Sequence, residues 1–246
     1  MRIGITECGD PSLDFSWVNK VDTVDGIILI TKNLTDIVIE KASQNLNKFI
    51  FHVTCTGFGG SVLEPNIPNY NIQLEQAQKL IKLGVDLNKI VIRVDPIIPT
   101  EKGLRTARTV IETAINMGFI RFRVSLLDAY PHVRTRFIEN GIPTPYGDYF
   151  SPNIKMIENA NKMFAELKVL YPEIAIESCA EKDLIETEIL GCASKKDFEL
   201  LGLNTDLVDS VGYQRKNCLC CSAKTELLEK KQRCPYNCLY CYWRNK

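Results

Sequence analysis

The sequence is poor in histidine and has no long apolar run. Only two histidines occur in 246 residues, so a metal site built from several imidazoles is excluded. No apolar segment approaches the roughly 20 residues that a membrane-spanning helix needs, and the first residues lack the apolar stretch of a secretory signal. We therefore expect a cytoplasmic protein that has no membrane partner.

The charges balance over the whole chain but are unevenly distributed. The 30 basic residues equal the 30 acidic ones, yet residues 215–246 hold 8 Lys and Arg against 2 Asp and Glu. Such a basic tail offsets the negative charge of a thiolate-ligated cluster, forms a solvated face, or binds an anionic partner such as nucleic acid. The excess is small compared with that of a basic nucleic-acid-binding domain, which favours the first two interpretations.

Apolar, β-branched runs alternate with helical patterns along the chain. Buried strands are predicted at residues 2–6, 26–31, 49–54, 90–94, 121–126 and 174–178, and helices at 35–47, 73–83, 103–117 and 153–170. This alternation predicts parallel strands joined by right-handed crossovers, in a barrel or a doubly wound sheet. Six units are too few for a full eight-stranded barrel, so we predict an α/β fold, a partial (βα)6 TIM-like barrel. The length suits a single domain over 1–246, with the barrel in 1–209 and a cysteine-rich, loop-like, cluster-binding tail in 210–246.

Ten cysteines in a cytoplasmic protein indicate metal binding rather than disulfides. The strongest signal is Cys234, Cys238 and Cys241, a C-x3-C-x2-C spacing. Three thiolates on one loop can hold three corners of an iron–sulfur cubane and leave the fourth iron open. Zinc stays an alternative, because another cysteine could complete a closed site.

A second set of thiols is available elsewhere in the chain. Cys179, Cys192, Cys218 and Cys220 supply four ligands, enough for an auxiliary iron–sulfur cluster or a closed zinc site. The alternative is that Cys179 is a small buried apolar residue at the end of a strand. Cys8 and Cys55 are expected to lie in the core or near the site without a role.

The spacing of Cys234, Cys238, Tyr240 and Cys241 matches the C-x3-C-x-aromatic-C signature of the radical S-adenosylmethionine (SAM) superfamily, although here it lies close to the end of the sequence. In this the chain resembles the DUF1848 family of circularly permuted, radical SAM-like proteins, which are similar to spore photoproduct lyases. The other matching segments are residues 31–33, 56–59, 63–68, 93–97, 179–181, 191–192 and 218–220. One segment differs, because residues 7–10 read Glu-Cys-Gly-Asp where the family pattern suggests Arg-Arg-Thr-Asp.

The resemblance implies an enzyme that reductively cleaves SAM at a four-iron, four-sulfur (4Fe–4S) cluster to generate a 5′-deoxyadenosyl radical. It implies an external electron donor such as flavodoxin or ferredoxin, and a nucleic acid or nucleotide as the substrate class. The residues predicted to bind SAM are Lys32, Gly57, Gly59, Gly60, Arg93, Asp95 and Tyr240. The alternative function is a non-enzymatic, metal-stabilised α/β module that binds nucleic acid.

Several of these residues have a structural interpretation beside the functional one. Glycines 57–60 either let the backbone approach the methionine part of SAM or form a plain turn. Alternation places Arg93 on the same strand face as Asp95, so its partner is an internal carboxylate (Asp95 or Asp128) or SAM. Arg121, Arg123 and Ser125 alternate likewise, and residues 128–136, which include Arg134 and Arg136, follow at the end of the strand. These groups could line an anionic-substrate pocket, but we expect most of the arginines to cap the following helix or face water. His132 is predicted to lie in a loop.

Overall fold

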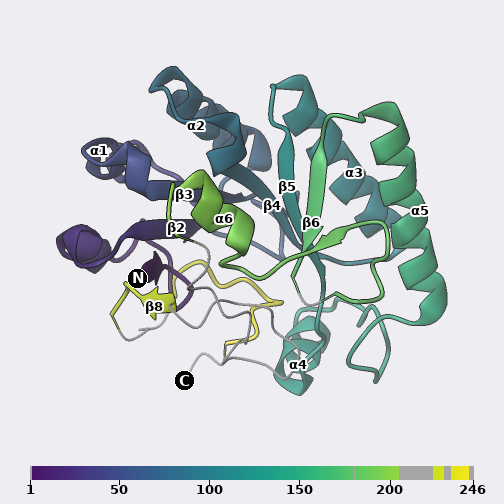
Figure 1. Ribbon diagram of the computed structural model, residues 1–246. Coiled ribbons are helices and arrows are strands. Elements are labelled where there is room, and N and C mark those ends of the chain that lie inside the picture. The colour runs from purple at the N-terminus through teal and green to yellow at the C-terminus, as the bar shows by residue number, and fades with distance from the viewer. Residues whose placement is uncertain (1, 180, 205–223, 230–233, 244–246) are drawn as a thin grey trace.

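The computed structural model describes residues 2–179, 181–204, 224–229 and 234–243 (Figure 1). Its centre is an eight-stranded, wholly parallel sheet in the order β7-β6-β5-β4-β3-β2-β1-β8. The strands are β1 (Ile3–Ile5), β2 (Gly26–Thr31), β3 (Phe49–Thr54), β4 (Ile90–Ile97), β5 (Arg121–Leu126), β6 (Ala175–Ser178), β7 (Glu188–Ile189) and β8 (Lys224–Glu226). The six predicted strands are confirmed as β1 to β6, and with them the α/β class.

Helices follow most of the strands. They are α1 (Asp36–Ser43), α2 (Tyr70–Lys82), α3 (Glu101–Asn116), α4 (Pro131–Glu139), α5 (Ile154–Leu170) and α6 (Lys195–Leu200), with short 3-10 helices η1 (Phe15–Thr23), η2 (Leu46–Lys48) and η3 (Leu87–Lys89). Side-chain caps fix several starts, as where Thr100 accepts from the backbone N–H of Gly103 and Asn153 from that of Met156. None of the described helices is long and apolar enough to cross a membrane.

The larger core lies between one face of the sheet and helices α1, α2, α3 and α5, which cover it (Figure 1). Alternate residues of the strands point to this face, so β3 contributes Phe49, Phe51 and Val53. The Phe49 ring stacks on Phe51 and meets the edge of Trp17 from η1, at centroid distances of 5.5 and 5.9 Å. This is the core that the apolar pattern predicts.

The opposite face of the sheet carries a smaller apolar cluster, over which α6 lies (Figure 1). Phe198 of α6 is fully buried there against isoleucines of β1, β2 and β3. A capping box fixes the start of α6, because Ser194 and Asp197 each accept a hydrogen bond from the other's backbone N–H. Helix α6 therefore covers this face of β1, β2 and β3.

Next to this cluster, the same face of the sheet carries charged rather than apolar side chains. Arg121 and Arg123 of β5 are 1% exposed and both donate to Glu177 of β6, at 2.8 and 2.6 Å. Arg121 also donates to Asp197 of α6 at 2.6 Å. The expectation that these two arginines cap a helix or face water is wrong, because β6 and α6 supply buried carboxylates that neutralise them.

The tail is not wholly loop-like, as β8 shows. Its three residues pair in parallel with β1, and the backbone N–H of Leu227 continues the pairing to the carbonyl of Ile5 at 2.9 Å. The Glu226 carboxylate accepts from the backbone N–H groups of Glu7 and Cys8, both at 2.9 Å. The tail thus adds an edge strand to the sheet, a correction to the prediction. Among the described residues, β7 and β8 are the two edges of the sheet and do not pair with each other. The partial barrel therefore stays a prediction.

Candidate functional site

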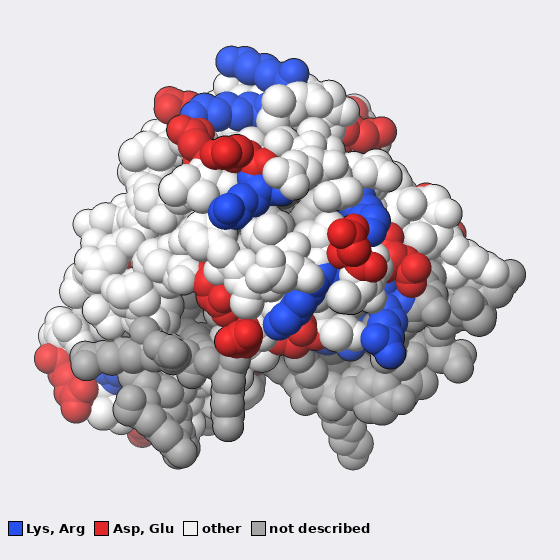
Figure 2. Space-filling view, turned by 90° about the vertical axis from the view of Figure 1, so that its left-hand side faces the viewer, with Lys and Arg blue, Asp and Glu red and all other residues white. Residues whose placement is uncertain are grey.

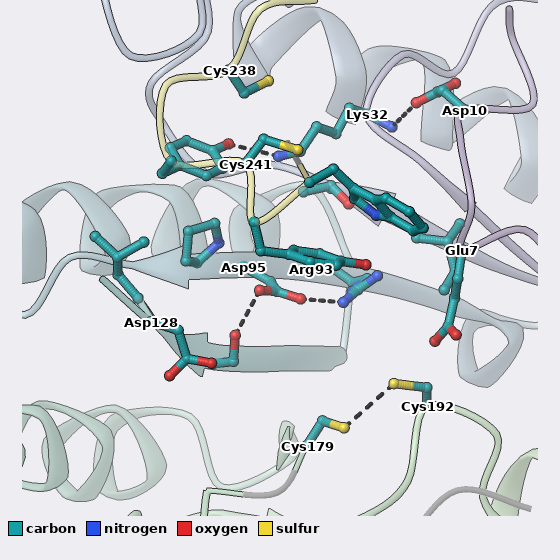
Figure 3. Close-up of a pocket in the computed structure, with 18 of the residues that line it drawn as sticks. Glu7, Asp10, Lys32, Arg93, Asp95, Asp128, Cys179, Cys192, Cys238 and Cys241 are labelled. Atoms are coloured by element: carbon teal, nitrogen blue, oxygen red, sulfur yellow. Dashed lines mark hydrogen bonds and ion pairs between the residues drawn. The ribbon is translucent and has the colours of Figure 1, made fainter. Parts of the chain in front are cut away.

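A cavity of about 280 Å³ opens at the carboxyl ends of strands β1 to β6 (Figure 3). Parallel strands bring their carboxyl ends to one edge of a sheet, which is where α/β proteins bind ligands. Most of the predicted site residues line this cavity: Lys32, Arg93, Asp95, Cys179, Cys192, Cys234, Cys238, Tyr240 and Cys241. Segments that lie far apart in the sequence therefore meet at a single place.

Three predicted SAM-binding glycines are placed differently. Gly57, Gly59 and Gly60 do not line the cavity. A side chain on Gly57 would meet Thr106 at 2.4 Å, and one on Gly59 would meet the carbonyl oxygen of Pro68 at 2.1 Å. Close packing of the loop after β3 explains these two glycines, and contact of the three with SAM stays a prediction. Of the predicted metal ligands, Cys218 and Cys220 lie outside the described residues.

The loop between β3 and α2 holds one side of the cysteine motif. The backbone N–H of Leu239 donates to the carbonyl of Leu63 at 3.0 Å, and the Asn66 side chain donates to the carbonyl of Pro235 at 2.7 Å. These bonds use the backbone of the motif, so they position the loop without engaging its thiols.

Helix α4 holds the other side of the motif. Arg136 donates to the carbonyls of Cys241 and Trp243 at 2.6 and 2.8 Å, and His132 Nε2 lies 2.8 Å from the carbonyl of Tyr242. His132 belongs to the first turn of this helix rather than to a loop, which corrects the prediction. Helix α4 was not predicted from the sequence, because it is short and begins at Pro131 directly after the turn that ends β5.

Lys32, directly after β2, connects the motif to a buried carboxylate. Its ammonium group lies 2.9 Å from Glu64 and 2.7 Å from the Tyr240 hydroxyl, which itself donates to Glu64. Thr56 donates to the other oxygen of Glu64 at 2.6 Å, and Glu64 is 1% exposed. Burial lowers the pKa of Lys32, but Glu64 and then Cys238 outweigh burial and raise that pKa. A fixed cation therefore stands beside the cysteine motif.

The three motif cysteines line the cavity, and two of them affect the pKa of the third, Cys238. Burial raises the pKa of Cys238 to about 12; Lys32 opposes this, while Glu64, Cys241 and Cys234 add to it. Among the described residues, no three His, Cys, Asp or Glu side chains converge as ligands of a single ion. A cubane binds each thiolate to a different iron, so it does not need such convergence. Three thiols on one cavity wall, with an adjacent ammonium group, suit that cluster.

Arg93 and Asp95 lie on the same face of β4, as predicted, and form an ion pair. Asp95 also accepts from the Ser125 hydroxyl at 2.6 Å. Burial raises the pKa of Asp95, but Arg93 and then Ser125 outweigh burial and lower it. Arg93 Nε is buried and donates to none of the described residues, whereas the side chain as a whole is 15% exposed and lines the cavity.

Across the cavity from the motif, Cys179 and Cys192 lie side by side (Figure 3). Their sulfur atoms are 3.3 Å apart. The structure thus brings together two of the four residues predicted for the second metal site.

Comparison with known protein families gives a match over most of the chain. The sequence profile described as a domain of unknown function (DUF1848) matches residues 13–243. The chain belongs to the DUF1848 family. A comparison with curated proteins finds no match.

The matched region of this DUF1848 chain includes most of the cavity. Three of the cavity's carboxylates were not predicted as site residues: Glu7, Asp10 and Glu181. Each follows a strand or its neighbouring turn, and that position is the signal that could have found them. With Asp95 and Asp128, the described lining has five carboxylates but only two side-chain cations, Lys32 and Arg93, and both cations are paired with carboxylates.

Proposed function

We propose that this DUF1848 protein is a radical SAM enzyme whose 4Fe–4S cluster is bound by Cys234, Cys238 and Cys241. The observation that carries the proposal is that these three thiols line one cavity with Lys32, Arg93 and the other charged groups at the strand ends. When bound, the cluster and SAM supply the chemistry: reductive cleavage that gives a 5′-deoxyadenosyl radical able to abstract hydrogen from a substrate. A partial (βα)6 TIM-like barrel is the scaffold that we propose.

The cavity's charges suit SAM. SAM carries a sulfonium and an ammonium group, and the lining holds five carboxylates that favour such cations. The ammonium group of Lys32 offsets the negative charge of thiolate ligands at the motif. Arg93, whose side chain is partly exposed at the cavity, can bind the carboxylate of the methionine moiety with a charge-assisted hydrogen bond.

The same tail segment can exclude water from the reaction. Tyr236, Tyr240, Tyr242 and Trp243 line the cavity beside the thiols, so bound ligands would meet aromatic rings on that wall. A dry site prevents quenching of a reactive intermediate. An electron donor such as flavodoxin or ferredoxin is part of the proposal.

A nucleotide or nucleic acid stays the predicted substrate class, with one qualification from the charges. The described cavity lining has five carboxylates and two cations, a balance that disfavours a phosphate there. Among the described residues of the face shown in Figure 2, acidic and basic side chains are interspersed. The excess of carboxylates in the cavity favours the enzyme over a nucleic-acid-binding module.

The deciding experiment is anaerobic reconstitution of the full chain with iron and sulfide, followed by a SAM-cleavage assay with a chemical reductant. We expect about four bound irons per chain and release of 5′-deoxyadenosine. A protein that binds only zinc and leaves SAM intact would contradict the proposal and support the non-enzymatic module.

Replacing Arg93 with methionine is expected to weaken SAM binding. Methionine keeps much of the side-chain volume but removes the charge, and losing a charge-assisted hydrogen bond costs about 1.5–3 kcal/mol. SAM affinity, measured by equilibrium dialysis, should fall roughly 10- to 150-fold at constant iron content.

The matched control is Arg108→Met. Arg108 is also paired with carboxylates, Glu112 and Glu166, but lies on α3 outside the cavity, so SAM affinity should not change. If Arg93→Met binds SAM normally and only unfolds more easily, Arg93 is a structural partner of Asp95.

A further inference from the structure

The pair of thiols opposite the cysteine motif has a geometry of its own. Cys179 directly follows β6, and Cys192 lies between β7 and α6. Their sulfur atoms are 3.3 Å apart, whereas a disulfide bond is about 2.05 Å long. A small approach of the two side chains would therefore bring them to bonding distance. Both residues are partly exposed and line the cavity, so a small molecule there can reach them.

The backbone around both cysteines is tied down by hydrogen bonds. Next to Cys179, the carbonyl of Ser178 accepts from Leu190 at 2.8 Å, which continues the pairing of β6 with β7. Next to Cys192, the carbonyl of Gly191 accepts from Arg123 at 2.7 Å. These bonds of the neighbouring residues thus hold the two cysteines next to each other.

Charged groups surround Cys192. Burial lowers the pKa of Arg93, but Asp95 and then Cys192 raise it above its ordinary value, and Cys192 acts on Arg123 in the same sense. Burial and then Cys192 also raise the pKa of Glu7, so charged groups of both signs lie near this sulfur. The short distance between the two sulfurs is what favours a reaction between them.

We propose that Cys179 and Cys192 form a dithiol that converts reversibly to a disulfide by exchange with a small-molecule disulfide that enters the cavity. One protein thiolate attacks a sulfur of the small disulfide, forms a mixed disulfide and releases one thiol. The second protein thiolate attacks the mixed disulfide at the protein sulfur and releases the other thiol. The two protein thiols lose two electrons and two protons, and the small disulfide is reduced to two thiols.

This pair goes beyond the proposed function, because its chemistry needs neither the cluster nor SAM. It also bears on the predicted second metal site. Sulfurs joined in a disulfide are no longer thiolate ligands, so a site that uses Cys179 and Cys192 exists only in the reduced protein. Disulfides in the reducing cytosol are usually transient, catalytic or redox-sensing, and a pair at the wall of a ligand cavity fits that use.

The sequence allows a direct test by peptide mapping. Trypsin cuts at Lys182, so Cys179 and Cys192 fall on separate peptides, residues 169–182 and 183–195, each with a single cysteine. The full-length wild-type chain is reduced, freed of metal with a chelator, exposed anaerobically to oxidised glutathione, alkylated, and digested without reductant. We expect most chains to yield the two peptides joined by a disulfide, and dithiothreitol to separate them.

Variants make the result specific. In Cys192→Ser we expect the 169–182 peptide to carry glutathione, the trapped mixed disulfide. Cys55→Ala, which removes a buried cysteine outside the cavity, should form the joined peptides as the wild type does. The variant with Cys234, Cys238 and Cys241 all changed to alanine should form them too, which separates this proposal from the cluster.

Two results would overturn the proposal. One is that Cys179 and Cys192 of the wild-type chain stay reduced during exposure to oxidised glutathione and are therefore both alkylated. The other is that residues 169–182 or 183–195 are joined mainly to peptide 217–224, which carries Cys218, Cys220 and Cys221.

Discussion

Replacing Cys234, Cys238 and Cys241 together with alanine is expected to remove about four iron atoms per chain and to abolish SAM cleavage. The change deletes the three proposed cluster ligands. The segment should stay in place, because many of its described anchors are groups that the change retains, such as the Cys241 carbonyl bound by Arg136 and the Tyr240 hydroxyl bound to Glu64. Iron and sulfide analysis, release of 5′-deoxyadenosine and circular dichroism check the three parts of this expectation.

The matched control is Cys55→Ala. Cys55 is 1% exposed and does not line the cavity, so iron content and SAM cleavage should equal those of the wild type. If the triple variant retains all of its iron, the assignment of the cluster to this motif fails. If it loses both its iron and its circular dichroism, the metal is needed for folding, and we would then measure the three single variants.

The parallel sheet could be predicted from the sequence because its strands are marked by local patterns. β2 and β3 are apolar runs with polar or glycine borders, and the structure buries every residue in both. Burial of whole strands is typical of parallel sheets covered on both faces. β8 could not be predicted, because Lys224–Glu226 is short and polar and its pairing with β1 depends on a contact far away in the chain.

The ionic part of the core could not be predicted for a related reason. Arginine in a strand is usually at the surface, and Arg121 and Arg123 are buried only because Glu177 and Asp197 meet them there. These carboxylates come from β6 and α6, so the pattern of β5 alone carries no sign of them. Arg93 differs, since its partner Asp95 lies two residues away and alternation reveals the pair.

The position of the cavity was predicted better than the charged groups that surround it. Lys32, Arg93 and the motif cysteines were expected at strand ends or on the cysteine loop, and the parallel sheet brings those segments to one edge. Glu64 was not expected to bind Lys32 and Tyr240. The reason is that Glu64 lies in a loop, and only the fold of that loop over the strand ends buries its carboxylate.

Replacing Glu177 with glutamine is expected to destabilise the protein strongly. Glu177 is fully buried and accepts from Arg121, Arg123 and Lys196 at 2.8, 2.6 and 2.8 Å. The variant keeps the size of the side chain but leaves two buried guanidinium groups with only Asp197 as a carboxylate partner. Removing one partner of a buried ion pair costs about 3–5 kcal/mol, which denaturant unfolding at pH 7 would measure.

The control and the pH dependence test the same cause. Glu166→Gln removes the partly exposed partner of Arg108 and should cost less than about 1 kcal/mol. Burial raises the pKa of Glu177, but Arg123 and then Arg121 outweigh burial and lower that pKa from 4.5 to about 2. Its stabilisation is therefore present above pH 4.5 and is lost as the pH falls toward 2. The wild type should lose more stability than Glu177→Gln over that interval. Equal losses, or a Glu177→Gln variant as stable as the wild type at pH 7, would show that the ion cluster does not hold β5, β6 and α6 together.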